Sequence, residues 1–386
     1  MRICSLGSLA RGLFVPALLL VLAGCGTNNT NSNNNNQSGD MCSGCSFVYA
    51  TTNTNQLLSF KVEPGGALGA PASTQGGADS PAIIGGGPLY ESDPANNAID
   101  AFDVNSSNGT LTAIAGSPFS IGSSTGSPAG LLFANNYSGS YLYVGDTNGT
   151  IAAFNAASSG VLTALSGSPF PAGVAPVNLA WSYNSNTGAS FLYAADFSGG
   201  GIYGFTIDSN GALTPVAGSP FATAPGSAPA AMVVGAGATG GGTLYVALSA
   251  LNEIAAYSVQ DSGALTALTG SPFLAGRGPA TLLAYSNFFY SLNGLDHTIS
   301  GYSVDLNTGV LTEIAGSPFP AGTALAGLID GHNGDIYVPD TQSNGILGFS
   351  VNATTGSLTP LAGSPFLTSA GPVALTSVAF PVLDPP

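Results

Sequence analysis

One part of the chain gathers side chains that could transfer a proton and stabilise a developing anion. Asp296 and His297 are adjacent, and Arg277 lies upstream of them. Histidine is the side chain best suited to moving protons near neutral pH, and arginine can hold a carboxylate or a developing oxyanion. Arg277, Asp296 and His297 are therefore our candidate catalytic residues. The alternative interpretation is an ordinary surface histidine near a loop arginine.

A second set of candidates is a series of aspartates that follow short apolar runs. Carboxylate oxygens are ligands that Ca²⁺ prefers, but an aspartate at a tight turn also caps that turn with its own side chain. We favour turn capping and keep calcium as the alternative, and no other cofactor is required. The candidate metal ligands are Asp93, Asp146, Asp196 and Asp340.

The composition excludes several classes of protein. The 386 residues include 4 Lys and Arg against 19 Asp and Glu, and charged residues make up 6%. Nucleic-acid binding needs a basic surface, which this chain cannot build. With 55 glycines, 26 prolines and 44% hydrophobic residues, the composition is typical of many short strands joined by tight turns.

The N-terminus has the pattern of an export signal. Two arginines precede an apolar run at 13–22, which is shorter than a transmembrane helix needs. The following Leu-Ala-Gly-Cys ending resembles the bacterial lipobox, which implies cleavage before Cys25 and acylation of its thiol. A plain signal peptide cut nearby is the alternative. We therefore expect a lipoprotein signal peptide at 1–24 and a protein that is exported and anchored to a bacterial membrane, on its periplasmic side or at the cell surface.

The next segment, 25–45, is predicted to be a tether. It is rich in Asn, with Ser, Thr and Gly, and little in it would gain from burial. Cys42 and Cys45 form a C-x-x-C pair at its end. A catalytic dithiol with this spacing is typical of a βαβ context, which is missing here. Because disulfides persist in exported proteins, we favour a local disulfide that fixes the start of the first strand.

A nine-residue signature, Leu-Thr-x-x-x-Gly-Ser-Pro-Phe, recurs six times along the rest of the chain. A degenerate seventh copy lies upstream around Leu68. Repeats of roughly 40–50 residues indicate propeller blades or helical repeats. The six signatures end at Phe119, Phe170, Phe221, Phe273, Phe319 and Phe366.

The residues within one repeat distinguish the two architectures. Between 176 and 221, three apolar or alternating runs and a turn at 208–211 precede a fourth run, which predicts a four-stranded antiparallel blade. A glycine in the hairpin before the fourth strand supplies the positive φ of a tight turn. The proline of Gly-Ser-Pro should stop pairing of the outer strand, and the phenylalanine after it should wedge between blades.

Residues 46–386 are therefore predicted to form an all-β, seven-bladed β-propeller of four-stranded antiparallel blades. Blade 1 begins at 47–50 with the pattern of a second strand, so its innermost strand is missing at the N-terminus. The run at 372–380 has the pattern of a first strand, and no repeat follows it. We expect this C-terminal strand to pair into blade 1 and close the ring, which removes free strand edges.

The pattern Ile-x-Gly-Tyr-Ser-Val-Asp-x-x-Thr-Gly-x-Leu-Thr at 299–312, followed by Gly-Ser-Pro-Phe, resembles the seven-bladed lactonase-like propellers. That family includes the 6-phosphogluconolactonase type and overlaps the YVTN-type surface repeats. The resemblance implies the propeller fold and the activity of a lactone hydrolase. The quoted residues are structural turns and strands, and fold does not by itself carry function.

The charge distribution argues against a phosphorylated substrate. Without the signal peptide the chain keeps only Lys61 and Arg277 as cations, and a rim of aspartates would repel an anion. We therefore favour a membrane-anchored, exported binding or interaction module, for a protein or a small neutral or cationic ligand at the channel mouth. The alternative is an enzyme that hydrolyses an uncharged lactone. We expect a monomer with no nucleic-acid partner.

Overall fold

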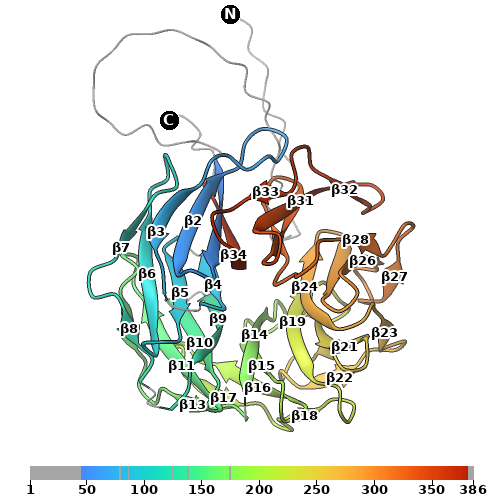
Figure 1. Cartoon of the computed structure of the whole chain (residues 1–386). Coiled ribbons are helices and arrows are strands. Elements are labelled where there is room, and N and C mark those ends of the chain that lie inside the picture. The colour runs from blue at the N-terminus through green and yellow to red at the C-terminus, as the bar shows by residue number, and fades with distance from the viewer. Residues whose placement is uncertain are drawn as a thin grey trace, which may run out of the picture. The chain divides into compact units, whose positions relative to one another are not determined.

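The computed structural model describes residues 45–380, except for 78, 79, 86, 123, 124, 137, 138 and 174. The predicted signal peptide, Cys25, most of the tether and Cys42 lie outside these residues. The described residues all belong to one unit of the chain, 39–386 (Figure 1). Within the described residues, no helix is long and apolar enough to cross a membrane.

The described strands form seven antiparallel sheets, which are the blades of a propeller (Figure 1). Each blade has four strand positions, and the sheets follow one another along the chain. From the innermost strand outwards, blade 1 consists of β34 (Pro372–Ala379), β1 (Ser46–Thr52), β2 (Gln56–Lys61) and β3 (Ala72–Gln75). Blade 2 consists of β4 (Ile83–Gly85), β5 (Leu89–Asp93), β6 (Ala98–Val104), and β7 (Leu111–Ala113) with β8 (Phe119–Ser120). Blade 3 consists of β9 (Pro128–Asn136), β10 (Gly139–Asp146), β11 (Thr150–Ala156), and β12 (Leu162–Ala164) with β13 (Phe170–Pro171).

The remaining blades repeat this order. Blades 4 to 7 consist of β14 (Pro176–Tyr183), β15 (Ser190–Asp196), β16 (Gly201–Ile207), and β17 (Leu213–Pro215) with β18 (Phe221–Ala222); β19 (Pro229–Gly235), β20 (Thr243–Leu248), β21 (Glu253–Val259), and β22 (Leu265–Ala267) with β23 (Phe273–Leu274); β24 (Pro279–Tyr285), β25 (Phe288–Asn293), β26 (Thr298–Val304), and β27 (Leu311–Glu313) with β28 (Phe319–Pro320); and β29 (Ile329–Asp330), β30 (Asp335–Asp340), β31 (Gly345–Val351), and β32 (Leu358–Pro360) with β33 (Phe366–Leu367).

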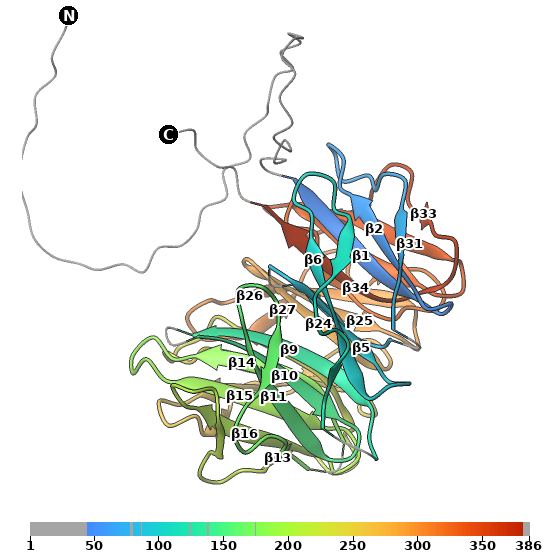
Figure 2. The same cartoon turned by 90° about the vertical axis from the view of Figure 1, so that its left-hand side faces the viewer.

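The ring closes as the sequence predicts. β34 pairs antiparallel with β1, from Ser46 opposite Ala379 to Thr51 opposite Ala374. The two strands lie side by side although they come from opposite ends of the chain (Figure 2). Val378 of β34 is buried in the apolar cluster between blades 1 and 2. The seven-bladed, all-β fold with a C-terminal closing strand is thus confirmed.

Seven tyrosines fasten each blade to the next. Each lies on the second strand of its blade, is buried, and donates a hydrogen bond of 2.7–3.2 Å from its hydroxyl to the carbonyl of a hairpin glycine in the following blade. The glycines have φ between 71° and 83°, so they adopt the left-handed turn that the sequence predicts. The pairs are Tyr49–Gly109, Tyr90–Gly160, Tyr143–Gly211, Tyr193–Gly263, Tyr245–Gly309, Tyr290–Gly356 and Tyr337–Gly66.

The outer strand is where one prediction was wrong. Pairing does not stop at Gly-Ser-Pro: in blade 6 it resumes at Phe319, which lies opposite Ile299. The gap leaves the Gly301 amide without a strand partner, and Ser317 accepts its hydrogen bond at 3.1 Å. The same contact recurs in the other five signature blades. The serine therefore satisfies a backbone donor that the interruption would otherwise orphan.

The phenylalanine of each signature packs between blades as predicted. Phe319, for example, joins an apolar cluster with Tyr290 of its own blade and Ile336 and Val338 of the next. Similar clusters fill the other blade junctions. The core is therefore a series of interfaces between blades, and the connecting turns are left to form the two faces of the ring.

Candidate functional site

The candidate catalytic residues lie in two neighbouring segments where blade 6 begins. Arg277 lies between β23 and β24, and Asp296 and His297 lie in the turn between β25 and β26. Asp296 Oδ2 accepts a hydrogen bond from the backbone amide of Arg277 at 2.6 Å, and the Leu295 amide donates to the Arg277 carbonyl at 3.1 Å. One side-chain and one main-chain hydrogen bond thus join the two segments, and all three candidate residues are exposed.

His297 has a backbone conformation set by the blade. Its φ is 58°, and its carbonyl accepts a hydrogen bond from the Ala321 amide at 2.9 Å. The equivalent turn residue of every other blade is an asparagine or a glycine, which tolerate the left-handed region better than other residues. These residues are Asn55, Asn97, Gly149, Gly200, Asn252 and Asn344. His297 therefore occupies a turn position that has the left-handed backbone conformation in every blade.

The four candidate metal ligands lie on four different blades, each as the last residue of a second strand. Asp196 illustrates their contacts: its Oδ1 accepts hydrogen bonds from the amides of Gly199 in its own turn and Ala175 in the segment that enters the blade. Asp93 and Asp146 each accept from an amide of their own turn. These contacts match the favoured turn-capping interpretation.

Asp340 makes the fullest set of such contacts. Burial acts to raise its pKa, but hydrogen bonds from the Ala324, Thr323 and Ser343 amides outweigh burial and leave the pKa below its usual value. Within the described part of the chain, no group of three or more His, Cys, Asp or Glu side chains could hold a metal ion together. Calcium binding at this rim stays a prediction.

Cys45 opens the described chain immediately before β1 and is disulfide-bonded. Its predicted partner, Cys42, lies outside the described residues. Lys61 lies at the end of β2, the third strand of blade 1, as the sequence predicts.

Sequence reasoning missed one buried acid. Glu91 on β5 is 1% exposed, and its Oε2 has no hydrogen-bond partner among the described residues. Burial raises the pKa of Glu91 to about 8; the Gly77 amide opposes this shift, and Asp100 adds to it. The signal in the sequence is an acid at an inward position of a second strand, next to Tyr90.

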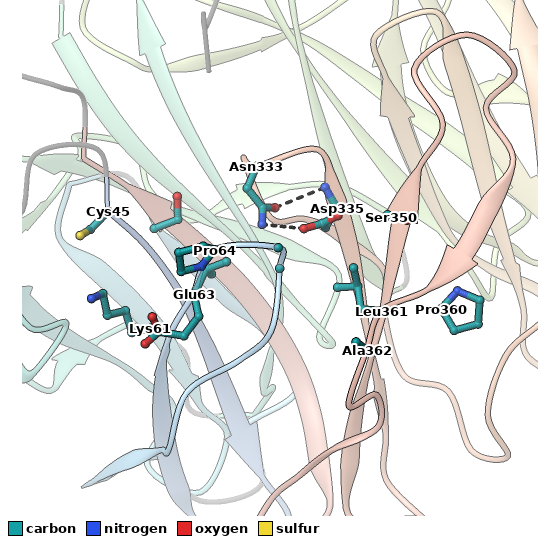
Figure 3. Close-up of a pocket in the computed structure, with 14 residues that line it drawn as sticks. Cys45, Lys61, Glu63, Pro64, Asn333, Asp335, Ser350, Pro360, Leu361 and Ala362 are labelled. Atoms are coloured by element: carbon teal, nitrogen blue, oxygen red, sulfur yellow. Dashed lines mark hydrogen bonds between the residues drawn. The ribbon is translucent and has the colours of Figure 1, made fainter. Parts of the chain in front are cut away.

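A pocket of about 670 Å³ lies between blade 1 and blade 7, on the face opposite the Arg277 site. Figure 3 shows Lys61 and Glu63 on its blade 1 side, with Asn333 and Asp335 on its blade 7 side. Asn333 Nδ2 donates to Asp335 Oδ2 at 2.7 Å, and burial raises the pKa of Asp335. The lining groups combine one ammonium with two carboxyl groups.

The described residues form a seven-bladed propeller in which Arg277, Asp296 and His297 lie at one blade junction. The family model for lactonases with a seven-bladed β-propeller matches residues 90–368, so this chain belongs to that lactonase family. A comparison with curated protein sequences gave no match.

Solved structures with the same fold include bacterial proteins named for lactonase activity. A provisionally assigned 6-phosphogluconolactonase from Bacteroides fragilis has 18% identity and a TM-score of 0.70, and the match covers 89% of this chain and 100% of that one. Another from Bacteroides uniformis has 18% identity and a TM-score of 0.71 over 87% and 99%. The periplasmic gluconolactonase PpgL of Pseudomonas aeruginosa has 15% identity and a TM-score of 0.69 over 87% and 100%. These likenesses establish the shared fold.

Proposed function

We propose that this protein hydrolyses an uncharged lactone at the junction that carries Arg277, Asp296 and His297. The main support is structural. This chain belongs to the lactonase family, matched over 90–368, and a hydrogen bond joins its Arg277 segment to the turn that holds Asp296 and His297. The names of the relatives from Bacteroides and Pseudomonas support the class of reaction.

In the proposed reaction His297 acts as the general base. Its imidazole takes a proton from water while the water oxygen forms a bond to the lactone carbonyl carbon. The carbonyl oxygen becomes an oxyanion, which the Arg277 guanidinium stabilises. The tetrahedral intermediate then collapses, the ring carbon–oxygen bond breaks, and the imidazolium returns its proton to the leaving alkoxide. The product is the hydroxy acid, and His297 is neutral again.

Asp296 is a positioning residue in this scheme. It accepts from the Arg277 amide, and the Arg277 carbonyl accepts from Leu295, so both sides of the Arg277 peptide are fixed. A guanidinium on a fixed backbone loses less freedom when it holds the oxyanion than one on a mobile loop does.

The charge of the chain supports an uncharged substrate. Its formal net charge is −15, and within the described chain Arg277 is the only Lys or Arg on its face, because Lys61 lines the pocket on the opposite face. A single guanidinium in a negative field attracts a phosphorylated sugar poorly. The proposal retains export and lipid anchoring at Cys25, both drawn from residues outside the described part.

The test compares two histidines that share a backbone conformation. His297 and His332 both have φ near 60°, and His332 lies in a first-to-second-strand turn on the opposite face, where it pairs with Asp330 at 3.7 Å. With γ-butyrolactone and gluconolactone as substrates, we expect His297→Asn to lower kcat by about 100-fold or more and His332→Asn to leave it unchanged. Full activity in His297→Asn would overturn the proposed mechanism.

A second candidate function is ligand binding without turnover, as the sequence first favoured, and the pocket between blades 1 and 7 favours it. Glu63 and Asp335 against Lys61 make the pocket suited to a small neutral or cationic ligand. Calorimetric titration with small amines and neutral sugars tests this function. Binding that Glu63→Gln weakens would support it, and no binding at millimolar concentration would contradict it.

A further inference from the structure

Three leucines near Arg277 are exposed to water. Leu274 is 80% exposed, Leu295 65% and Leu251 37%, and they make up half of the six large hydrophobic residues that are exposed in the described chain. Scattered exposed leucines are normal, but a group of them indicates a binding surface. We call these three residues the leucine patch.

Hydrogen bonds place the leucine patch around Arg277. The segment that contains Arg277 and Gly278 is held between two turns, because Gly278 donates to Asn252 Oδ1 at 2.9 Å and Arg277 donates to Asp296 Oδ2 at 2.6 Å. Leu251 directly precedes Asn252, and Leu295 directly precedes Asp296. The two leucines therefore lie on opposite sides of the Arg277 segment.

The other contacts fix the patch in place. A Cβ added to Gly278 would lie 2.8 Å from Leu295 Cγ, so the Leu295 side chain lies over this glycine. Leu274 is the last residue of β23 and lies three residues before Arg277 in the chain. The Leu274 carbonyl accepts a hydrogen bond from the Tyr302 hydroxyl at 2.6 Å. The leucine patch is thus built on main chain that blades 5 and 6 hold together.

The blade does not require leucine at these turns. The equivalents of Leu295 in the other six turns are Asn53, Ala95, Thr147, Ser198, Ala250 and Gln342, and the equivalents of Leu251 are Thr54, Asn96, Asn148, Gly199, Asp296 and Ser343. All of these are polar or small. Leucine appears at these positions only in the two turns that flank Arg277.

We infer that the leucine patch binds the alkyl chain of a lactone whose ring carbonyl meets Arg277. This inference rests on the proposed function and names its substrate class as alkyl-substituted lactones. An alkyl chain gains from contact with exposed leucines, while the neutral ring avoids the repulsion that an anion would meet. An anionic membrane surface fits less well, because the chain has a net charge of −15.

The first experiment measures kcat/KM for γ-lactones of increasing side-chain length, from γ-butyrolactone to γ-dodecalactone. We expect kcat/KM to rise about two- to fourfold for each methylene that reaches the leucine patch. Leu295→Ser and Leu251→Ser should each lower kcat/KM for γ-dodecalactone several-fold more than they lower kcat/KM for γ-butyrolactone. Leu306→Ser is the matched control, because Leu306 is 43% exposed but lies in a turn on the opposite face.

The second experiment separates this inference from the proposed function. An alkyl γ-lactam with an eight-carbon chain resists hydrolysis, and its binding is measured by calorimetry. Lactam binding that Leu295→Ser abolishes supports the leucine patch even if no lactone is hydrolysed. Hydrolysis that is independent of chain length and unaffected by the leucine variants would keep the proposed function and overturn this inference. A third outcome would also overturn the inference. The protein would sediment with neutral phosphatidylcholine vesicles, the leucine variants would lose this sedimentation, and no lactam would bind.

Discussion

At the residue scale, His297 combines a chemical side chain with a structural backbone. Six equivalent turn positions hold asparagine or glycine with positive φ, so the fold should tolerate asparagine in place of His297. This arrangement allows chemistry and stability to be separated by the choice of substitution.

We predict that His297→Ala lowers the free energy of unfolding by about 1 kcal/mol relative to His297→Asn. Alanine in the left-handed region lacks the local hydrogen bonding that favours asparagine there. Denaturant unfolding of the two variants measures the difference. Equal midpoints with equal slopes would show that the turn does not strain an ordinary residue.

Glu91 gives the molecule a pH-dependent stability. Its pKa is raised from 4.5 to about 8 by burial, so the folded protein binds this proton more tightly than the unfolded chain does. Below about pH 4.5 the carboxyl group is protonated in both states. As the pH rises from about 4.5 to about 8, the unfolded chain releases the proton first, and stability falls across this window.

We predict that Glu91→Gln removes much of this loss. The amide stays neutral, so the variant should gain on the order of a few kcal/mol over the original chain at pH 8 and little at pH 4.5. Melting temperatures across this pH range measure the effect. Asp103→Asn, an exposed change on the neighbouring β6, is the control and should leave the pH profile unchanged.

At the element scale, the tyrosine–glycine contacts make each blade depend on the next. We predict that Tyr290→Phe lowers the free energy of unfolding by about 1–2 kcal/mol, because it removes the 2.7 Å hydrogen bond to the Gly356 carbonyl in a buried site. Tyr203→Phe is the control, since Tyr203 is only partly buried. Urea midpoints compare the two, and an equal effect in both variants would argue against a role for the hydroxyl.

At the scale of the whole molecule, stability depends on β34. We predict that deleting 372–386 lowers the free energy of unfolding by several kcal/mol, because it exposes the edge of β1 and removes the buried Leu375 and Val378. Truncation after Phe380, which keeps β34, should melt like the full chain. Calorimetry of the two truncated proteins tests this prediction, and equal melting of the two would contradict closure by this strand.

The repeats, together with the strand patterns at 47–50 and 372–380, determined the number of blades, the hairpin glycines and the closing strand, because each of these depends on local turn chemistry and on strand periodicity. The aspartates at the ends of second strands were also readable as turn caps. The renewed pairing of the outer strand after its interruption could not be predicted, because the sequence does not reveal that the Ser317 hydroxyl accepts a hydrogen bond from the Gly301 amide.

Only the tertiary structure decided which distant residues meet. The tyrosines of the second strands recur as visibly as the glycines, but their pairing spans more than 60 residues in most blades and 271 between Tyr337 and Gly66. The same holds for the docking of Asp296 on Arg277 and for the leucine patch. Local sequence specifies the blade, whereas contacts between blades depend on the angle at which neighbouring sheets pack, which no single repeat encodes.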